Sequence, residues 1–305
     1  MPMKIGIVGW GEIAREHASH FVTNGAELGG VVSSRKHPDL SVPVFQSLAE
    51  MLPHIDAITI AVPNHLHASL CLQAVEAGTP ALVEKPLCIS TSELKSLEET
   101  FHRLTVPVHL GYRLRWNPTT LALKRRIKNL RRIKCVYQLG IEQLADTKDW
   151  TRRVDITGGS FFTLGVHCLD LARWLADADG APLSNLQASA THGDDSADYP
   201  LNVWLSGTLP NGVEIVAGAD LRGNTDSRLV LEIDADEGSY PDSDLPPPVP
   251  ADEPVEYAAL IANFIQAVEA NKVDKNCSDE ILQTHRELLM ARDLAQASVE
   301  GSVDQ

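Results

Sequence analysis

Two basic side chains far apart in the chain could support proton transfer, and the first is Lys85. It follows directly after the strand-like run Ala81–Glu84. Removing an ammonium group from water lowers its pKa, which prepares a lysine to move a proton or to hold a developing alkoxide. Taken alone, the pattern is more typical of a surface lysine.

The second such side chain is His167, which lies in the helical stretch Ser160–Asp177. Thr163 is four residues before it and Asp170 is three residues after it, so both lie near His167 on the helix surface. Apolar residues flank His167 on both sides. Taken alone, it is therefore better interpreted as a hydrogen-bonded core histidine.

A glycine-rich turn, Gly9-Trp10-Gly11-Glu12-Ile13-Ala14, joins a β-branched run to a helical stretch. It has the G-x-G-x-x-A form of a dinucleotide fingerprint. Gly9 permits the tight turn, Gly11 lets the backbone approach a pyrophosphate, and Ala14 allows close packing of helix and strand. The helix N-terminus would then bind the anion. Its place inside a βαβ pattern makes the signal specific.

The end of the second strand indicates which dinucleotide is bound. In NAD-binding proteins an Asp or Glu about twenty residues after the fingerprint usually contacts the ribose hydroxyls. Here the sequence reads Ser33-Ser34-Arg35. Two hydroxyls and a guanidinium suit a 2′-phosphate, so NADP(H) is favoured over NAD(H). The alternative is that Arg35 is a solvated loop charge.

Alternating strands and helices must position these residues in the first part of the chain. Short β-branched runs predict strands, and stretches with helical periodicity predict helices. The strands are Lys4–Val8, Leu28–Ser33, Ala57–Val62, Ala81–Glu84 and Pro107–Gly111, and the helices are Glu12–Phe21, Ala68–Ala77 and Thr91–Leu104. This alternation predicts a doubly wound parallel sheet, at whose carboxyl edge ligands bind.

After Pro118 the pattern changes to longer alternating runs, which predict an α+β domain with an open, largely antiparallel sheet. Pro210-Asn211-Gly212 predicts a hairpin within it. The strands are Ile133–Leu144, 184–192, 201–209 and 212–221, and the helices are Thr119–Leu130, Ser160–Asp177, Tyr257–Ala270 and Asp279–Ser298, the last capped by Ser278. We expect domains at 1–118 and 119–305, with the C-terminal helix packing back on the first.

Residues 229–271 contain no Lys or Arg, and their centre is acidic and proline-rich. The pattern favours a solvated loop at the edge of the sheet over an interaction tail.

Charge and cysteine content narrow the class of protein. The 305 residues include 26 Lys and Arg against 41 Asp and Glu, and the acidic excess lies entirely after residue 153. Such a surface repels nucleic acid and anionic lipid, so we expect neither as a partner. The five cysteines show no C-x-x-C spacing, which predicts no metal site and favours a reducing cytoplasm. No secretory signal or membrane span of ~20 apolar residues is expected.

Five ordered motifs together resemble the Gfo/Idh/MocA family, named for glucose–fructose oxidoreductase, inositol dehydrogenase and a rhizopine-catabolism protein. They are GIVGWGEIA at 6–14, AVPNHLH at 61–67, EKP at 84–86, GYRLRWNP at 111–118 and GGSFFTLGVHCLDLARWL at 158–175. The resemblance covers essentially the whole chain. It implies an N-terminal Rossmann domain and a C-terminal domain whose open sheet often forms the oligomer interface, and hence a homodimer or homotetramer.

The resemblance also implies roles for particular residues. Lys85 matches the family's catalytic lysine, usually followed by a cis peptide at Pro86, and His167 matches its proton-transferring histidine. Hydride leaves a carbinol carbon only as the hydroxyl loses its proton, so a base and a cation must meet at that oxygen. The expected cofactor site comprises Gly9, Trp10, Gly11, Glu12, Ile13, Ser33, Ser34, Arg35, Ala61, Pro63, Asn64, His67, Glu84, Lys85 and Arg115.

Thr163, the third expected catalytic residue, departs from the pattern of many sugar and inositol dehydrogenases in the family, which have Asp at this position. A threonine cannot ionise and can only hydrogen-bond. Some branches, including UDP-N-acetylhexosaminuronate dehydrogenases, also have a neutral residue here. The oxidoreductase interpretation therefore stands, but the inositol dehydrogenase mechanism transfers less directly.

The substrate is expected to bind between the domains, at Lys85 and His167 and beside a group of basic residues. This group comprises Arg113, Arg115, Lys148, Arg152 and Arg153, with Trp150 among them. It would suit an anionic substrate such as a sugar acid or a nucleotide sugar. A solvated loop paired with Asp146 and Asp149 is an equally good interpretation.

The sequence thus favours an NAD(P)-dependent dehydrogenase or reductase acting on a secondary alcohol or ketone of a sugar, cyclitol or sugar derivative. Two alternatives remain open. One is a dinucleotide-binding regulator without turnover, which the neutral Thr163 permits and Lys85 with His167 disfavours. The other is a glycosidase that uses bound NAD transiently, whose additional residues have no counterpart identified in this sequence.

Overall fold

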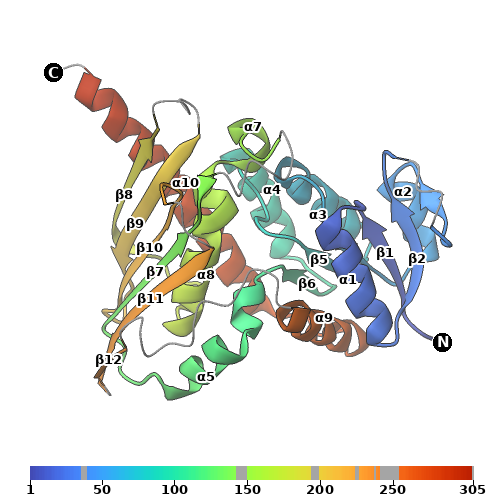
Figure 1. The fold of residues 1–305 in the computed structure, drawn as a ribbon. Helices are drawn as coiled ribbons and strands as arrows, with labels where there is room; N and C mark the ends of the chain where they lie inside the picture. Colours follow the sequence, from blue (N-terminus) through green and yellow to red (C-terminus); the bar gives the residue numbers. More distant parts are fainter. Residues whose placement is uncertain are drawn as a thin grey trace.

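The computed structural model describes residues 1–35, 40–141, 150–193, 199–223, 227–236, 238–240 and 254–303. Two sheets lie at opposite sides of the molecule, with helices between them (Figure 1). None of the helices in these ranges is long and apolar enough to cross a membrane.

The first sheet has six parallel strands in the order β3-β2-β1-β4-β5-β6. The predicted doubly wound sheet is therefore confirmed. Its strands are β1 (Lys4–Val8), β2 (Glu27–Val32), β3 (Val44–Phe45), β4 (Ala57–Ile60), β5 (Ala81–Val83) and β6 (Val108–Leu110). The edge strand β3 was not among the predicted ranges, because two residues are too few to show a period.

The helices of this domain are α1 (Glu12–Thr23), α2 (Leu48–Met51), α3 (His67–Glu76) and α4 (Thr91–Phe101), with the short turns η1 (Leu52–His54) and η2 (Asn64–Leu66). Ser90 caps α4, since its side chain accepts from Glu93 N–H while the Glu93 side chain accepts from Ser90 N–H. Strands β4 and β5 are buried throughout, as parallel strands covered on both faces must be. The chain adds β2 and β3 on one side of β1 and then adds β4, β5 and β6 on the other side. The strand order therefore reverses between β1 and β4, although all six strands are parallel.

The second sheet has six strands in the order β12-β11-β7-β10-β9-β8. Only β7 and β10 run parallel among its neighbouring pairs, which confirms the largely antiparallel sheet. Its strands are β7 (Arg132–Gln138), β8 (Ser184–His192), β9 (Pro200–Thr208), β10 (Glu214–Asp220), β11 (Arg228–Ala235) and β12 (Gly238–Tyr240). Gly212, at φ +86°, makes the predicted turn between β9 and β10.

The remaining helical elements are η3 (Arg113–Trp116), α5 (Pro118–Arg126), α7 (Val154–Thr157), η4 (Phe161–Gly165), α8 (Val166–Leu175), α9 (Pro254–Glu269) and α10 (Lys275–Val303). The turn η4 is π-helical and leads directly into α8. Helix α8 packs on β7 and β10, whereas α10 packs on β8 and α4. These two helices therefore connect the second sheet to the first domain.

Two expectations for the second domain were wrong. The flank of the acidic segment predicted to be a loop forms β11 and β12, because alternating Leu229, Leu231 and Ile233 give one apolar face despite the carboxylates between them. Residues 241–253, at its centre, lie outside the described ranges. Ser278 does not cap the last helix: α10 begins earlier, at Lys275, and the Ser278 hydroxyl donates to the Asp274 carbonyl.

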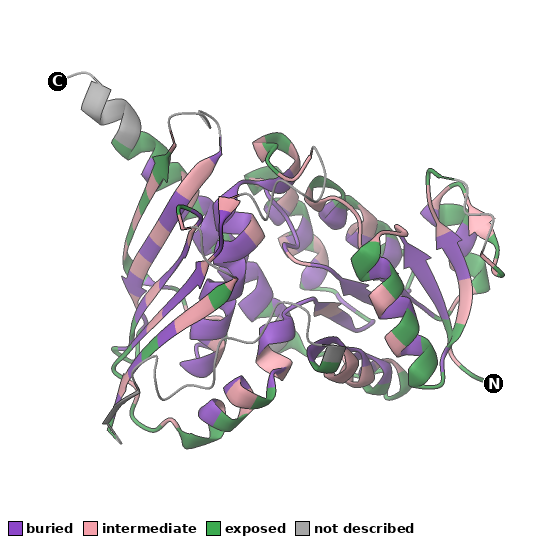
Figure 2. Ribbon diagram, in the orientation of Figure 1, coloured by how far each residue is buried: buried purple, intermediate pink, exposed green. Residues whose placement is uncertain are grey.

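Apolar side chains form two clusters. The larger runs from one face of the first sheet through α8 to the inner face of the second sheet. The smaller includes Phe21 of α1 and Phe264 of α9, which meet edge to face. Helix α9 thus packs against α1 although it is far along the chain (Figure 1). Buried residues concentrate along the strands and on the inward sides of the helices (Figure 2).

Candidate active site

The turn between β1 and α1 has the backbone shape needed for a pyrophosphate. Gly9 has φ +93°, and a Cβ there would lie 2.3 Å from the Ala61 carbonyl oxygen, so only glycine fits. Gly11 is the N-cap of α1, and no side chain in the described ranges caps it. The first N–H groups of α1, including those of Glu12 and Ile13, are therefore available to an anion. The residues present fit a dinucleotide.

The adjacent strand end, after β2, carries Ser33, Ser34 and Arg35. The Gly9 N–H donates to the Val32 carbonyl at 2.9 Å, which places this segment beside the glycine turn. Arg35 is exposed, and its N–H donates to Ser33 Oγ at 3.2 Å. Arg35 is thus an exposed residue three positions after the strand end that contacts the turn, and its selectivity stays a prediction.

Lys85 follows β5, the second strand beyond the reversal. Its Nζ donates to the Thr163 carbonyl at 2.8 Å, which links the first domain to η4. Burial lowers the pKa of Lys85 to about 8, with Arg113 adding to this and Glu84 opposing it. The Lys85–Pro86 peptide is cis. The Lys85 ammonium therefore has a neutral hydrogen-bond partner, and its pKa of about 8 is close to neutral pH.

His167 lies in the first turn of α8 and is buried. Its ring is 6.2 Å from that of Tyr137, and its Nδ1 has no hydrogen-bond partner among the described residues. Burial lowers the pKa of His167 well below its usual value, and the charges of Lys85 and Arg113 lower it further. The imidazole is therefore neutral at pH 7 and can accept a proton.

Thr163 lies in the π-helical turn η4, one turn before His167. Its hydroxyl donates to the Gly159 carbonyl at 3.2 Å and lies 2.8 Å from the hydroxyl of Tyr199. The structure thus brings together Thr163 and Lys85, as expected, and adds Tyr199. No sequence signal identified Tyr199, because it precedes β9 and carries no motif.

The segment after β4 is held by backbone contacts. The Asn64 side chain donates to the Thr157 carbonyl at 2.9 Å. In His67, Nε2 lies 2.8 Å from the Val62 carbonyl oxygen and Nδ1 lies 2.6 Å from that of Pro86. Burial lowers the pKa of His67 although both carbonyls oppose this. His67 therefore connects two loops at the sheet edge, with Ala61 and Pro63 half-buried beside it.

The Glu84 carboxylate belongs to a buried polar group. Its Oε1 lies 3.2 Å from His17 Nε2, and His17 Nδ1 is 2.8 Å from Thr59 Oγ1. The Tyr257 ring from α9 contacts His17 edge-on. Burial raises the pKa of Glu84, but His17 and Lys85 outweigh it and the pKa is lowered. His17 shares a helix face with apolar Ala14 and Phe21, a spacing that could have revealed it.

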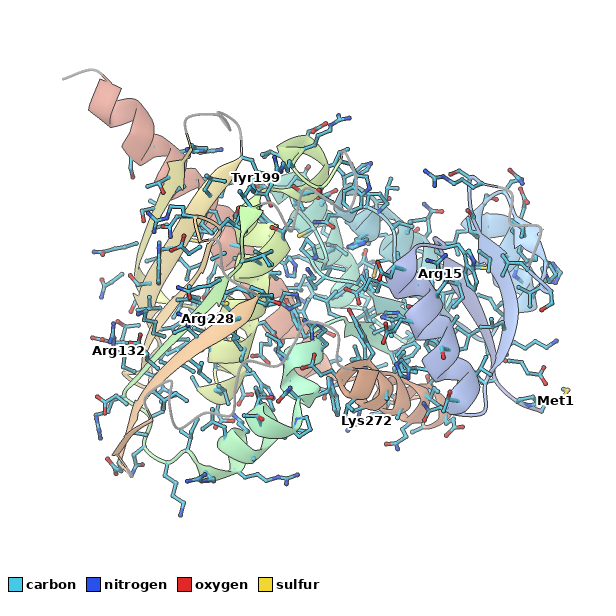
Figure 3. All side chains as sticks on the ribbon, viewed as in Figure 1. Met1, Arg15, Arg132, Tyr199, Arg228 and Lys272 are labelled. Carbon is cyan, nitrogen blue, oxygen red and sulfur yellow. The ribbon has the colours of Figure 1, made fainter. Side chains whose placement is uncertain are left out.

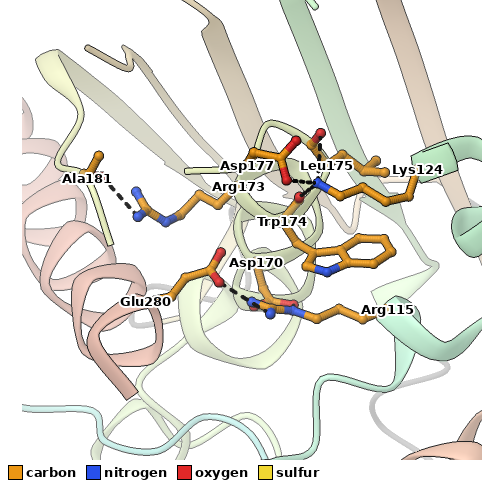
Figure 4. Close-up of polar contacts among 9 residues, drawn as sticks. All are labelled: Arg115, Lys124, Asp170, Arg173, Trp174, Leu175, Asp177, Ala181 and Glu280. Carbon is orange, nitrogen blue, oxygen red and sulfur yellow. Dashed lines mark hydrogen bonds and ion pairs between the residues drawn. The ribbon is translucent and has the colours of Figure 1, made fainter. Parts of the chain in front are cut away.

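Arg113 and Arg115, in η3, both pair with carboxylates. Arg113 pairs with Glu256 of α9, a residue that sequence reasoning missed. Arg115 donates through Nε to Asp170 at 2.9 Å and through Nη1 to Glu280 at 3.4 Å (Figure 4). These carboxylates compensate both charges, so the expected roles of the two arginines toward cofactor or substrate remain predictions.

The other basic residues expected at the substrate lie before α7. Arg152 donates to the Ile141 carbonyl at 3.1 Å, and Arg153 is ion-paired with Asp155 at 2.5 Å. Trp150 is half-buried. Lys148, Asp146 and Asp149 lie outside the described residues. The pairing of Arg153 thus uses a carboxylate other than those anticipated.

Curated relatives match part of the chain. Glucose-6-phosphate 3-dehydrogenase of Bacillus subtilis (strain 168) is 30% identical over 58% of this chain and 54% of its own length. UDP-N-acetylglucosamine 3-dehydrogenase of Acidithiobacillus ferrooxidans is 26% identical over 69% of this chain and 64% of its own. The match to the first of these spans only about half of the relative's length. Both relatives are named as dehydrogenases of sugar derivatives.

The fold is also that of solved structures. GenD2 from gentamicin A biosynthesis, in complex with NAD, superposes with a TM-score of 0.82 over 97% of this chain and 94% of that one, at 18% identity. Two family models match adjoining parts of the sequence. The model described as "Oxidoreductase family, NAD-binding Rossmann fold" matches residues 3–112, and the "GFO/IDH/MocA C-terminal domain" matches residues 124–240. The chain therefore belongs to the Gfo/Idh/MocA oxidoreductase family.

Proposed function

We propose that this protein is an NAD(P)-dependent oxidoreductase that transfers hydride between nicotinamide and a secondary alcohol or ketone of a sugar, cyclitol or sugar derivative. The observation that carries the proposal is the pair formed by Lys85, after β5 of the first sheet, and His167 of α8, on whose imidazole the charge of Lys85 acts. Lys85 is a cation whose pKa is lowered to about 8, and the buried imidazole of His167 is neutral. The glycine turn and the N-terminus of α1, which fit a dinucleotide, follow β1 of the same sheet.

The bound nicotinamide supplies the hydride acceptor or donor. In the oxidation direction, His167 accepts the proton of the substrate hydroxyl, because its imidazole is neutral. The Lys85 ammonium donates a hydrogen bond to the same oxygen and stabilises the negative charge that develops there. Thr163 holds the ammonium through its carbonyl. In the reverse direction, the protonated His167 returns the proton to the forming alkoxide.

NADP(H) is the favoured cofactor. The exposed Arg35, with Ser33 and Ser34 beside it, follows β2 at the side of the glycine turn. A guanidinium can bind a phosphate through two parallel hydrogen bonds, whereas ribose hydroxyls gain little from it. The absence of Asp or Glu among residues 33–35 supports the same choice.

An anionic sugar derivative is the favoured substrate class. Two relatives are named for phosphorylated or nucleotide-linked sugars. Arg152 is exposed and lies near Tyr199: burial raises the pKa of Tyr199, and the Arg152 charge acts against this rise. Carboxylates already compensate Arg113 and Arg115. Arg152 is therefore the best-placed cation for a substrate phosphate or carboxylate.

The second sheet is the surface on which we expect a homodimer or homotetramer to form. Its half-buried side chains include Trp204 and Val216 on the neighbouring strands β9 and β10, and Val230 on β11. Four of the five cysteines, Cys71, Cys88, Cys135 and Cys168, are free and buried, which supports a reducing cytoplasm.

The proposal is tested by titrating the purified protein with NADPH and NADH by fluorescence and then scanning polyols, sugars and sugar phosphates for absorbance change at 340 nm. NADPH preference with turnover is the expected result. Tight binding without turnover on a broad panel would favour the regulator of the same fold. A cofactor that survives purification, with glycoside cleavage, would favour the NAD-dependent glycosidase. Binding of neither cofactor would overturn the dinucleotide site.

A further inference from the structure

A tyrosine outside every motif, Tyr199, contacts the turn that receives Lys85. It immediately precedes β9 and is 3% exposed. It lies at the end of the second sheet that is near α7 (Figure 3). Its hydroxyl is 2.8 Å from Thr163 Oγ1, and the Thr163 carbonyl accepts from Lys85 Nζ at 2.8 Å. One residue thus separates the tyrosine hydroxyl from the lysine.

The direction of these hydrogen bonds follows from the number of protons. The Thr163 hydroxyl has a single proton, which it donates to the Gly159 carbonyl. The 2.8 Å contact between the two hydroxyls allows either to donate; with the Thr163 proton on Gly159, Tyr199 is the donor. Burial raises the pKa of Tyr199 and keeps that hydroxyl protonated. The result is a directed chain from Tyr199 through Thr163 to Gly159.

A second contact reinforces the same junction. The Ser160 hydroxyl donates to the carbonyl of Pro200, the residue after Tyr199. Two hydrogen bonds therefore attach the start of β9 to η4: one from Tyr199 to Thr163 within the turn, and one from Ser160, the residue before the turn, to Pro200. The carbonyl that accepts from Lys85 belongs to the middle residue of this attached turn.

We infer that Tyr199 is a positioning residue for Lys85, acting through the hydroxyl of Thr163. The inference rests on the proposed function, because it takes Lys85 as the catalytic cation. The hydroxyl pair fixes the turn without adding a charge. A carboxylate at residue 163 would also fix it, but would stabilise the ammonium and raise its pKa. The charged or titratable neighbours of Lys85 among the described residues include Glu84, Arg113, His67 and His167.

The test is a double-mutant cycle with Tyr199→Phe and Thr163→Val. Tyr199→Phe keeps the ring and removes the donor, so kcat should fall about fivefold, as for loss of one neutral hydrogen bond. The cofactor dissociation constant should stay unchanged. If Tyr199 acts through Thr163, the double variant loses no more than the more impaired single variant. Thr163→Ser keeps the hydroxyl and should retain most of the activity.

The pH profile separates positioning from a loss of stability. When the turn shifts, the Lys85 ammonium loses a well-placed acceptor, so the ionisation near pH 8 should move to lower pH in Tyr199→Phe. Thr120→Val is the matched control: Thr120 is buried in α5, and its hydroxyl donates to the Leu114 carbonyl. It should lower the unfolding temperature and leave the profile unchanged.

Each result has a distinct meaning. Wild-type kcat and pH profile in Tyr199→Phe, or additive losses in the cycle, would overturn the role of Tyr199. Lys85→Ala is measured in parallel. Full turnover in that variant would refute the proposed function itself, whereas an inactive Lys85→Ala beside an unaffected Tyr199→Phe would refute only the inference about Tyr199.

Discussion

The cations that are buried or half-buried in this protein occur in two kinds of surroundings. Between α8 and α10, Arg173 is 0% exposed and donates to both carboxylate oxygens of Glu287 at 2.9 Å. Nearby, Arg115 pairs with Asp170 and Glu280 (Figure 4). At the edge of the first sheet, by contrast, Lys85 Nζ donates to a neutral backbone carbonyl.

The difference separates structural charges from reactive ones. A guanidinium paired with a carboxylate keeps its charge at any accessible pH and fixes the elements that it joins. An ammonium on a carbonyl is held in place but only weakly stabilised, so its proton is available near neutral pH. A neutral partner for a half-buried ammonium therefore marks Lys85 as the functional cation.

The largest expected effect concerns Lys85 itself. Lys85→Ala should lower kcat about 10³-fold, because the developing alkoxide loses its cation. The dissociation constant for NADPH, measured by fluorescence, should change less than the turnover. Full activity in this variant would show that Lys85 is a structural cation like Arg115 and Arg173, and would contradict the distinction between structural and reactive charges.

The matching change among the paired cations is Arg173→Met. It leaves the Glu287 carboxylate buried without its guanidinium, which should cost about 3–5 kcal/mol of unfolding free energy. Urea denaturation measures this. In the folded protein at low temperature, kcat should remain near the wild-type value. The double variant with Glu287→Gln should recover part of the stability, and a loss of kcat without a loss of stability would contradict the assignment.

An exposed arginine gives a smaller effect. Arg35→Ala should weaken NADPH binding about tenfold and NADH binding little, because a charge-assisted contact to the 2′-phosphate is lost. Fluorescence titrations with both cofactors check this. If both weaken equally, Arg35 does not select the phosphate.

The smallest expected effect is a change in the pH at which activity falls as Lys85 loses its proton. Lys85 acts as an ammonium, whose pKa burial lowers to about 8, so kcat/KM for oxidation should fall as pH rises through about 8. An ordinary lysine would give this limb above pH 10. Any residual activity of Lys85→Arg should lack the limb, since a guanidinium stays charged. A flat profile between pH 7 and 9.5 would contradict the ammonium role.

Much of the first domain was predictable because its signals are local. The fingerprint at Gly9 and Gly11 lies between a strand and a helix that the sequence identifies by period. Strand β5 was equally clear from its apolar run, and Lys85 follows it after Glu84. In the second domain, β11 was not predicted. Carboxylates alternate with its apolar residues, and the acidic composition of the segment was given more weight than this two-residue alternation.

The sequence by itself determined the parallel sheet, the dinucleotide turn and the choice of Lys85 and His167 as candidates. Only the tertiary structure decided which partner each charge has. Tyr199 reaches Thr163 across 36 positions, Arg115 meets Glu280 across 165, and the Leu87 N–H donates to His285 across 198. Such contacts have no local period or propensity, because packing of distant elements creates them. Within the described part of the chain, that packing gave Arg115 and Arg173 ion-paired carboxylates and gave the Lys85 ammonium a backbone carbonyl.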